Sequence, residues 1–158
     1  MNPDPTDGAP SGAGRRTRRR LSRELALRGL YQWRVAGGNA GTIEAQLREA
    51  REDGSLDEAY LSVLLRGVLA HAAELEERIA PHLDRTFNEL SPVEAGILLL
   101  GTYELAHQPE IPYRAVINEA VELAKTYGGT DGHKYVNGVL DRLASTLRVI
   151  ETGADARA

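Results

Sequence analysis

Cysteine is absent from this chain of 158 residues. Its absence excludes a disulfide framework, thiolate metal sites and a cysteine nucleophile. It also fits a reducing compartment such as the cytoplasm, where we expect the protein to work. Long apolar runs are missing as well: the longest, Ala95–Gly101, has seven residues, whereas a membrane helix needs roughly 18 or more. We therefore expect no membrane-spanning segment.

Strand-forming residues are scarce. The chain holds nine valines and six isoleucines against 21 leucines and 21 alanines, and leucine and alanine favour helices. No stretch alternates convincingly between apolar and polar residues, as a half-buried strand would. The composition predicts an all-α fold, and the length suits one domain.

Proline and glycine gather at the start of the chain. Residues 1–14 include three prolines and three glycines and offer almost nothing to bury. We expect this stretch to be a disordered arm. A single helical domain should follow over residues 15–150, with a flexible tail over residues 151–158.

Apolar spacing predicts six or seven helices, depending on whether the long stripe over residues 61–83 is one helix or two. Gly67 and His71 mark the expected break in that stripe. Ser91-Pro92 is a strong helix start, because serine caps the first turn and proline fits the first helical position. Asp131 is expected to cap the last helix. The other helices are expected over about residues 17–35, 43–51, 112–128 and 132–150.

The net charge of −4 conceals an uneven distribution. Residues 1–28 hold seven arginines and three acidic residues, a net charge of +4, whereas the remainder holds 12 basic and 20 acidic residues, a net charge of −8. A basic end on an acidic body indicates an anionic partner that docks at one place. Arginine suits phosphate because its guanidinium group can donate two parallel hydrogen bonds.

Sequence-specific binding of single-stranded RNA requires bases that stack on aromatic side chains. Tyr31 and Tyr135 are candidates for such stacking if their two helices lie side by side. Taken separately, each is better explained as a tyrosine at the core boundary with an exposed hydroxyl group.

Two motifs that could carry other chemistry are weak. Glu104 and His107 have the spacing used in di-metal helical bundles, but no second Glu-x-x-His occurs, so we interpret the pair as a solvated helix end. The glycine loop over residues 128–132 lacks a preceding strand, and His133 separates it from Lys134, which excludes a Walker-type nucleotide site. We therefore predict no metal, no cofactor, no catalytic residue and hence no enzyme.

Three ordered blocks resemble the NusB family of bacterial transcription antitermination factors. Arg23–Trp33 resembles the family's opening helix, Ile111–Lys125 is similar to its penultimate helix, and His133–Asp141 is similar to the start of its last helix. Glu94 and Tyr103–Leu105 fit between them. The resemblance covers roughly residues 15–148 of the chain. It implies about seven helices in two small bundles.

The resemblance also implies a function. Family members bind the boxA RNA of nascent ribosomal RNA leaders jointly with NusE, a basic small-subunit ribosomal protein, and the complex joins elongating RNA polymerase to suppress termination. The implied RNA contacts are Arg16, Arg19, Arg20, Arg23, Asp131, Lys134 and Tyr135. The implied contacts with NusE are Tyr31, Glu89 and Glu94. Leu21 departs from the family pattern, in which a further arginine is common, and Arg15, Arg16 and Arg18 are expected to compensate.

Two other classes of protein stay open. One is a NusB-like helical module related to the N-terminal domain of RNA cytosine methyltransferases, although the chain lacks a nucleophilic cysteine and a strand–glycine loop for a methyl donor. The other is an interaction module that forms a homodimer through its helices and hides the RNA surface.

Overall fold

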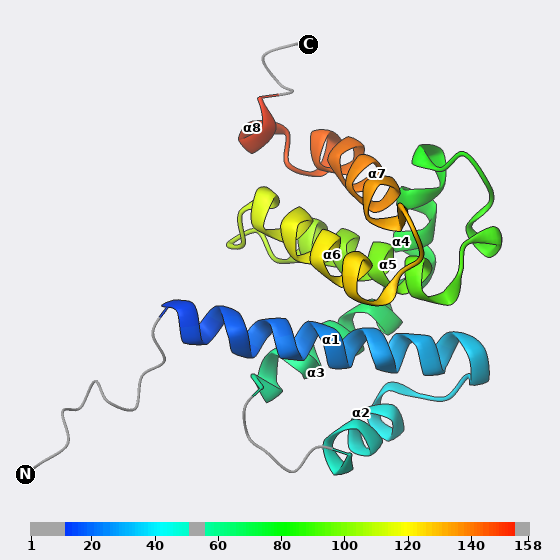
Figure 1. The fold of residues 1–158 in the computed structure, drawn as a ribbon, viewed down its shortest axis with the longest axis vertical. Coiled ribbons are helices and arrows are strands. Elements are labelled where there is room, and N and C mark those ends of the chain that lie inside the picture. The colour runs from blue at the N-terminus through cyan, green and yellow to red at the C-terminus, as the bar shows by residue number, and fades with distance from the viewer. Residues whose placement is uncertain (1–11, 51–55, 154–158) are drawn as a thin grey trace, which may run out of the picture.

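Helices account for all regular secondary structure in the computed structural model, which describes residues 12–50 and 56–153 (Figure 1). Within these residues the fold class is all-α, as predicted, and α8 is a single turn that follows seven longer helices. The elements are α1 (Gly12–Ala36), α2 (Ala40–Glu49), α3 (Glu58–Ala70), α4 (Ala72–Ile79), η2 (Ala80–His82), η3 (Phe87–Glu89), α5 (Pro92–His107), α6 (Tyr113–Tyr127), α7 (Gly132–Leu147) and α8 (Val149–Thr152).

The helices form two groups that α5 joins. Helices α1, α2 and α3 pack on one another, α4 to α7 form the second group, and α5 contacts members of both (Figure 1). Every residue of α5 from Ala95 to Leu105 is buried, because this helix is apolar on nearly every side and so suits the centre of the molecule. In the described part of the chain, no helix is both long enough and apolar enough to cross a membrane.

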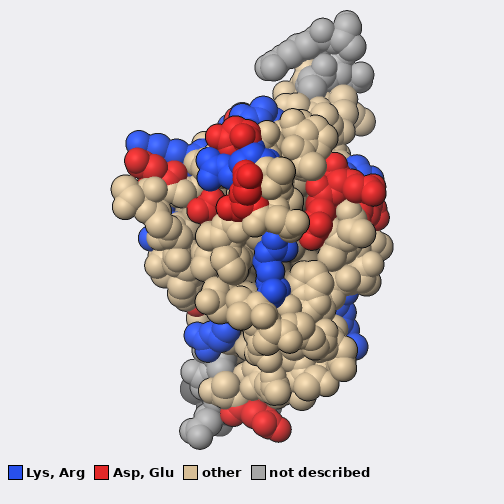
Figure 2. Space-filling model, turned by 90° about the vertical axis from the view of Figure 1, so that its right-hand side faces the viewer, with Lys and Arg blue, Asp and Glu red and all other residues tan. Residues whose placement is uncertain are grey.

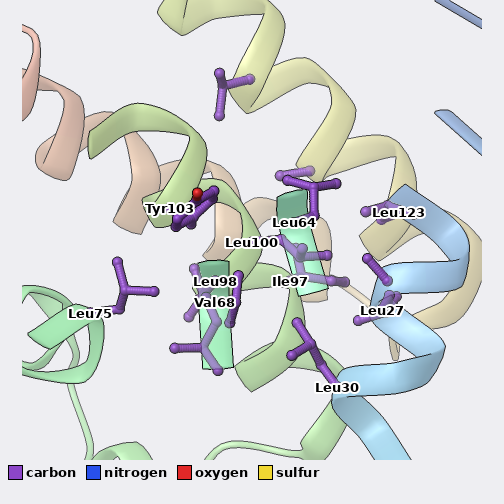
Figure 3. Packing of buried hydrophobic residues seen from close by; sticks show 14 of the residues in the cluster. Leu27, Leu30, Leu64, Val68, Leu75, Ile97, Leu98, Leu100, Tyr103 and Leu123 are labelled. Carbon is purple, nitrogen blue, oxygen red and sulfur yellow. The ribbon is translucent and has the colours of Figure 1, made fainter. Parts of the chain in front are cut away.

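The core lies where helices of both groups meet. Leucines of α1 and α3 point toward Ile97 and Leu100 of α5, and Leu123 of α6 closes the cluster (Figure 3). Two glycines of α5 allow neighbouring helices to approach closely. A Cβ atom at Gly96 would lie 2.8 Å from a leucine methyl of α1, and one at Gly101 would lie 2.8 Å from a leucine methyl of α7.

Local capping explains where several helices begin. The Ser91 hydroxyl accepts a hydrogen bond from the backbone N–H of Glu94 at 3.1 Å, so the predicted start of α5 is confirmed. Asn39 caps α2 in the same manner by accepting from Thr42. His71 separates α3 from α4, which confirms the predicted break in the long apolar stripe.

Some boundaries differ from the predictions. Helix α1 begins at Gly12, inside the stretch expected to be a disordered arm, and α8 extends to residue 152 of the expected tail. Helix α7 ends at Leu147, before the expected end at residue 150, and Ile150 is 89% exposed. Residues 1–11 and 154–158 of the predicted arm and tail lie outside the described residues, as does Asp53-Gly54, which is expected from the sequence to close the second helix.

The cap predicted at Asp131 is only half right. Asp131 does precede α7, but it has a left-handed backbone with φ of 64° and forms no side-chain hydrogen bond to the helix. Its carboxylate instead lies 3.3 Å from the ammonium group of Lys134. The following Gly132 starts the helix without a side-chain cap.

Candidate nucleic-acid interface

The first turns of α1 lie beside the start of α6. One groove, the arginine groove, is lined by four arginines of α1, two glutamates and three uncharged residues: Arg15, Arg16, Arg19, Arg23, Glu110, Glu119, Ile111, Pro112 and Ala115. Arg15 and Arg16 are exposed, and among the described residues neither has a carboxylate within ion-pair distance. Their guanidinium groups are therefore available to an anion that enters the groove.

Arg19 and Arg20 are partly exposed and already have partners. The Arg19 guanidinium lies 4.3 Å from the centroid of the Tyr60 ring, a cation–π arrangement. Arg20 donates two hydrogen bonds to the carboxylate of Glu119, at 3.0 and 2.9 Å. These bonds and the negative charge of Glu119 raise the pKa of Arg20. Since the Arg20 side chain is 53% exposed, its outer face can still meet a phosphate.

Arg23, also predicted to contact RNA, lines the same groove, but most of its side chain is buried. The Arg23 side chain is 7% exposed, and its guanidinium forms an ion pair with the carboxylate of Glu104 at 2.8 Å. The Tyr60 hydroxyl donates to the same carboxylate. Burial alone lowers the pKa of Arg23, but hydrogen bonds from Arg23 to Glu104 and the charge of that residue outweigh it, so the pKa is raised. Arg23 thus ties α1 to α5 inside the core.

The same contacts overturn the interpretation of Glu104 as part of a solvated helix end. Glu104 is only 2% exposed, and its carboxylate accepts hydrogen bonds from α1 and α3. Burial, followed by the charge of Glu104, raises the pKa of Tyr60, which therefore stays protonated as a donor. The His107 ring instead stacks on the rings of His71 and Tyr103. Glu104 and His107 therefore belong to different groups of side chains.

Tyr135, in the first turn of α7, is held from two directions. Its hydroxyl donates to Asp84 at 2.9 Å, and the guanidinium of Arg85 lies 4.6 Å from its ring centroid. Hydrogen bonds from Arg85 and then from Tyr135 lower the pKa of Asp84 to about 2. The neighbouring Lys134 is 72% exposed and pairs with the Asp131 carboxylate. Asp84 and Arg85 thus orient the ring of Tyr135, and the ammonium group of Lys134 belongs to the preceding residue. Together with Asp131 these residues form the Tyr135 group.

The arginine groove and the Tyr135 group lie at opposite ends of α6. The arginines meet the residues that precede and open α6, whereas α7 begins after the tight loop that follows it (Figure 1). The 15 residues of α6 span about 22 Å at 1.5 Å per residue. Tyr31 and Tyr135 are expected to act together only if their helices, α1 and α7, lie side by side. Helix α7 packs mainly on α5 and α6, whereas α1 packs mainly on α2, α3 and α5.

The three residues predicted to contact a partner protein come from neighbouring segments. Tyr31 is 46% exposed and lines an open, mostly apolar groove with Val93 and with Tyr127, which is 45% exposed. Glu94 directly follows Val93 in the first turn of α5. Glu89 is the last residue of η3, just before that turn. Tyr31, Glu89 and Glu94 therefore border one region at the start of α5, the partner region.

Figure 2 shows the side of the molecule toward which the end of α1 and the start of α7 point. Charged side chains of both signs stand in mixed groups on this face, around a broad area with few charges. Depletion of charge at the centre of a surface is typical of protein–protein contacts.

Sequence inspection missed Arg148, which holds the segment beside the arginine groove. The Arg148 side chain is 6% exposed. Its guanidinium donates to the backbone carbonyls of Leu105, Gln108 and Ile111 at 2.8–2.9 Å, and it pairs with Glu151. These bonds fasten the turn between α5 and α6. The only signal in the sequence is a single arginine within an apolar stretch near the end of the chain.

Comparisons with known proteins agree on one family. A family model described as the NusB family matches residues 20–145. A protein of Nitrosospira multiformis named Transcription antitermination protein NusB is 73% identical over 132 residues, which cover 84% of this chain and 84% of that protein. A protein of the same name from Burkholderia mallei is 56% identical over 140 residues, covering 89% of this chain and 97% of its own length.

Solved structures share the fold. NusB of T. maritima superposes with a TM-score of 0.71 at 31% identity, covering 80% of this chain and 89% of that one. A chain from a crystal structure of antitermination factors NusB and NusE in complex with dsRNA superposes with a TM-score of 0.72 at 27% identity, covering 80% of this chain and 96% of that chain.

Proposed function

The chain belongs to the NusB family, and we propose that it acts in transcription antitermination by binding boxA RNA together with a NusE-type ribosomal protein, within the complex of elongating RNA polymerase. It does so as a cytoplasmic adaptor without catalysis, and residues 15–150 act as one domain. The observation that carries the proposal is the pair of RNA-suited features at the two ends of α6, namely the arginine groove and the oriented ring of Tyr135.

The arginine groove supplies affinity and position, because phosphate contacts carry no sequence information. Arg16, Arg19 and Arg20 take this role, Arg15 adds a further exposed cation, and Arg23 borders the same groove from its buried ion pair. An RNA strand that follows α6 meets these arginines at one end of the helix. At the other end it reaches the exposed ammonium group of Lys134.

Tyr135 supplies the stacking surface that base recognition needs. The bond to Asp84 restrains the ring before RNA arrives, which lowers the entropy lost on binding. Arg85 covers one ring face, so a base stacks on the other face or takes the place of the guanidinium. Asp131, exposed beside Lys134, offers an acceptor to a base edge.

Salt dependence tests the arginine groove. The affinity for single-stranded boxA RNA, measured by fluorescence anisotropy, should fall by about 0.7 log units per log unit of salt for each phosphate neutralised. Arg16→Gln should weaken binding and flatten this slope by about 0.7. Arg48→Gln removes an arginine of α2 that is 46% exposed and should leave the slope unchanged. Equal slopes for both variants would contradict the assignment of the groove.

Substitutions at Tyr135 test stacking. Tyr135→Ala should weaken RNA binding by about 1–3 kcal/mol, whereas Tyr135→Phe keeps the ring and should retain most of the affinity. If Tyr135→Phe loses as much as Tyr135→Ala, the hydroxyl bond to Asp84 is what matters and stacking is refuted.

The partner region requires a separate readout. Tyr31→Ala and Glu94→Gln should weaken capture of NusE while the affinity for RNA alone stays at the wild-type value. Wild-type capture of NusE by both variants would remove Tyr31 and Glu94 from the partner contact.

Light scattering with and without RNA tests the homodimer, because a dimer that masks the interface should dissociate when RNA binds.

A further inference from the structure

A cluster of two histidines and one glutamate lies where the α3–α4 corner meets the end of α5. One ring nitrogen of His71, one ring nitrogen of His107 and a carboxylate oxygen of Glu74 lie within 4.8 Å of one another, and all three side chains are partly exposed. None of them belongs to the arginine groove, the Tyr135 group or the partner region. We propose that this cluster binds a divalent transition metal of the zinc type.

The distances are close to those that zinc requires. Tetrahedral zinc holds nitrogen and oxygen ligands at roughly 2.0–2.2 Å, which separates the ligand atoms by about 3.4 Å. His71 Nδ1 and Glu74 Oε2 are already 3.4 Å apart. The rings of His71 and His107 stack with centroids 4.5 Å apart and an interplanar angle of 27°. Side-chain rotations that shorten the remaining separations, all within 4.8 Å, complete the set.

His107 carries an atom that the fold leaves unexplained. Its Nε2 is shielded from solvent and has no hydrogen-bond partner within the described residues, and such buried polar atoms are rare in native proteins. A metal ion bound to the imidazole would give this ring a partner that the described residues do not supply.

The residues around the cluster hold the ligands in place. Glu74 accepts a hydrogen bond from Arg78 on Oε1 at 3.2 Å, so that Oε2 is left facing His71. The ring of Tyr103 lies 4.9 Å from that of His107 and forms the floor of the site. Tyr103 packs closely against the backbone of Gly67, where a Cβ atom would lie 2.3 Å from its hydroxyl oxygen. Outer contacts of this kind orient the ligands of known zinc sites.

Two histidines and a glutamate are a ligand set that zinc uses, with the fourth position left to water or to a group of another molecule. The bound ion ties the α3–α4 corner, at His71 and Glu74, to the end of α5, at His107. Metal binding to the folded state alone raises stability, so zinc should raise the thermal midpoint of the protein.

Calorimetric titration of the untagged, metal-free full chain with zinc chloride tests the proposal. We expect one zinc ion per chain. His71→Gln, His107→Gln and Glu74→Gln should each weaken binding by more than the roughly 10–100-fold that loss of an outer contact causes. His133→Gln removes a histidine in another part of the molecule and should bind zinc as the wild type does. The zinc-induced rise in the thermal midpoint should follow the same order.

A second measurement needs no variant. In NMR spectra of the wild-type protein, zinc should shift the ring signals of His71 and His107 and leave those of His82 and His133 in place. The proposal is overturned if zinc does not bind, if it shifts the other two histidines instead, or if the three ligand variants bind it as tightly as the wild type.

Discussion

Glu104→Met is expected to lower the free energy of unfolding by about 3–5 kcal/mol, because it leaves the charge of Arg23 buried without a partner. The Arg23 side chain is 7% exposed and the Glu104 side chain 2%, so water cannot replace the lost carboxylate. The substitution also removes the acceptor of the Tyr60 hydroxyl. Methionine nearly matches the volume of glutamate, so that loss of packing adds little to the effect.

Urea denaturation followed by circular dichroism measures this change in the free energy of unfolding. Thermal unfolding gives a second measure: in a chain of this size each kcal/mol corresponds to about 2–4 °C, so the thermal midpoint should fall by roughly 6–20 °C. Arg20→Met is the matched control, since it breaks the half-exposed ion pair with Glu119. Such pairs contribute about 1 kcal/mol or less.

The double variant Arg23→Met/Glu104→Met gives the sharper test. When both charges are removed, neither is left buried and unpaired, so much of the stability lost in the single variants should return. The reasoning is refuted if Glu104→Met costs less than about 1 kcal/mol, or if the double variant is as unstable as the two single losses added together.

Three further outcomes are expected. Arg148→Met should lower the free energy of unfolding by about 3 kcal/mol or more in urea titrations, because several buried carbonyls lose a charged donor. Gly101→Ala should cost about 1–3 kcal/mol through overlap with a leucine of α7, whereas Gly129→Ala, with open space around it, should leave the thermal midpoint nearly unchanged. The Asp84 carboxyl should titrate by NMR near pH 2 rather than at its ordinary 3.8, so its stabilising contribution is present above the ordinary value and is lost as the pH falls through about 2. Tyr135→Phe should raise the pKa of Asp84, since it removes one of the two side-chain donors to that carboxylate. An unchanged pKa of Asp84 would exclude the Tyr135 hydroxyl as a cause.

Helix content and most helix starts could be predicted from the sequence because they depend on neighbouring residues. The Ser91 cap and the break at His71 are set by hydrogen bonds and apolar spacing within a few positions. The exposed arginines at the start of α1 were also evident, since Arg15 and Arg16 lie in a run without apolar residues. The left-handed backbone of Asp131 was not, because nothing in its local sequence demands that conformation.

The role of each charged residue depended on contacts between distant parts of the chain. Arg23 stands one turn from Arg19 and Arg20, and its partner Glu104 lies 81 positions away. Whether an arginine of α1 faces solvent or the core is decided only where α5 crosses it. His71 and His107 likewise become neighbours only through the packing of α4 on α5. The sequence alone therefore determined the all-α fold and the basic end, since periodicity and capping are local. Tertiary packing decided which arginines remain exposed, because burial fixes which charges are neutralised within the protein.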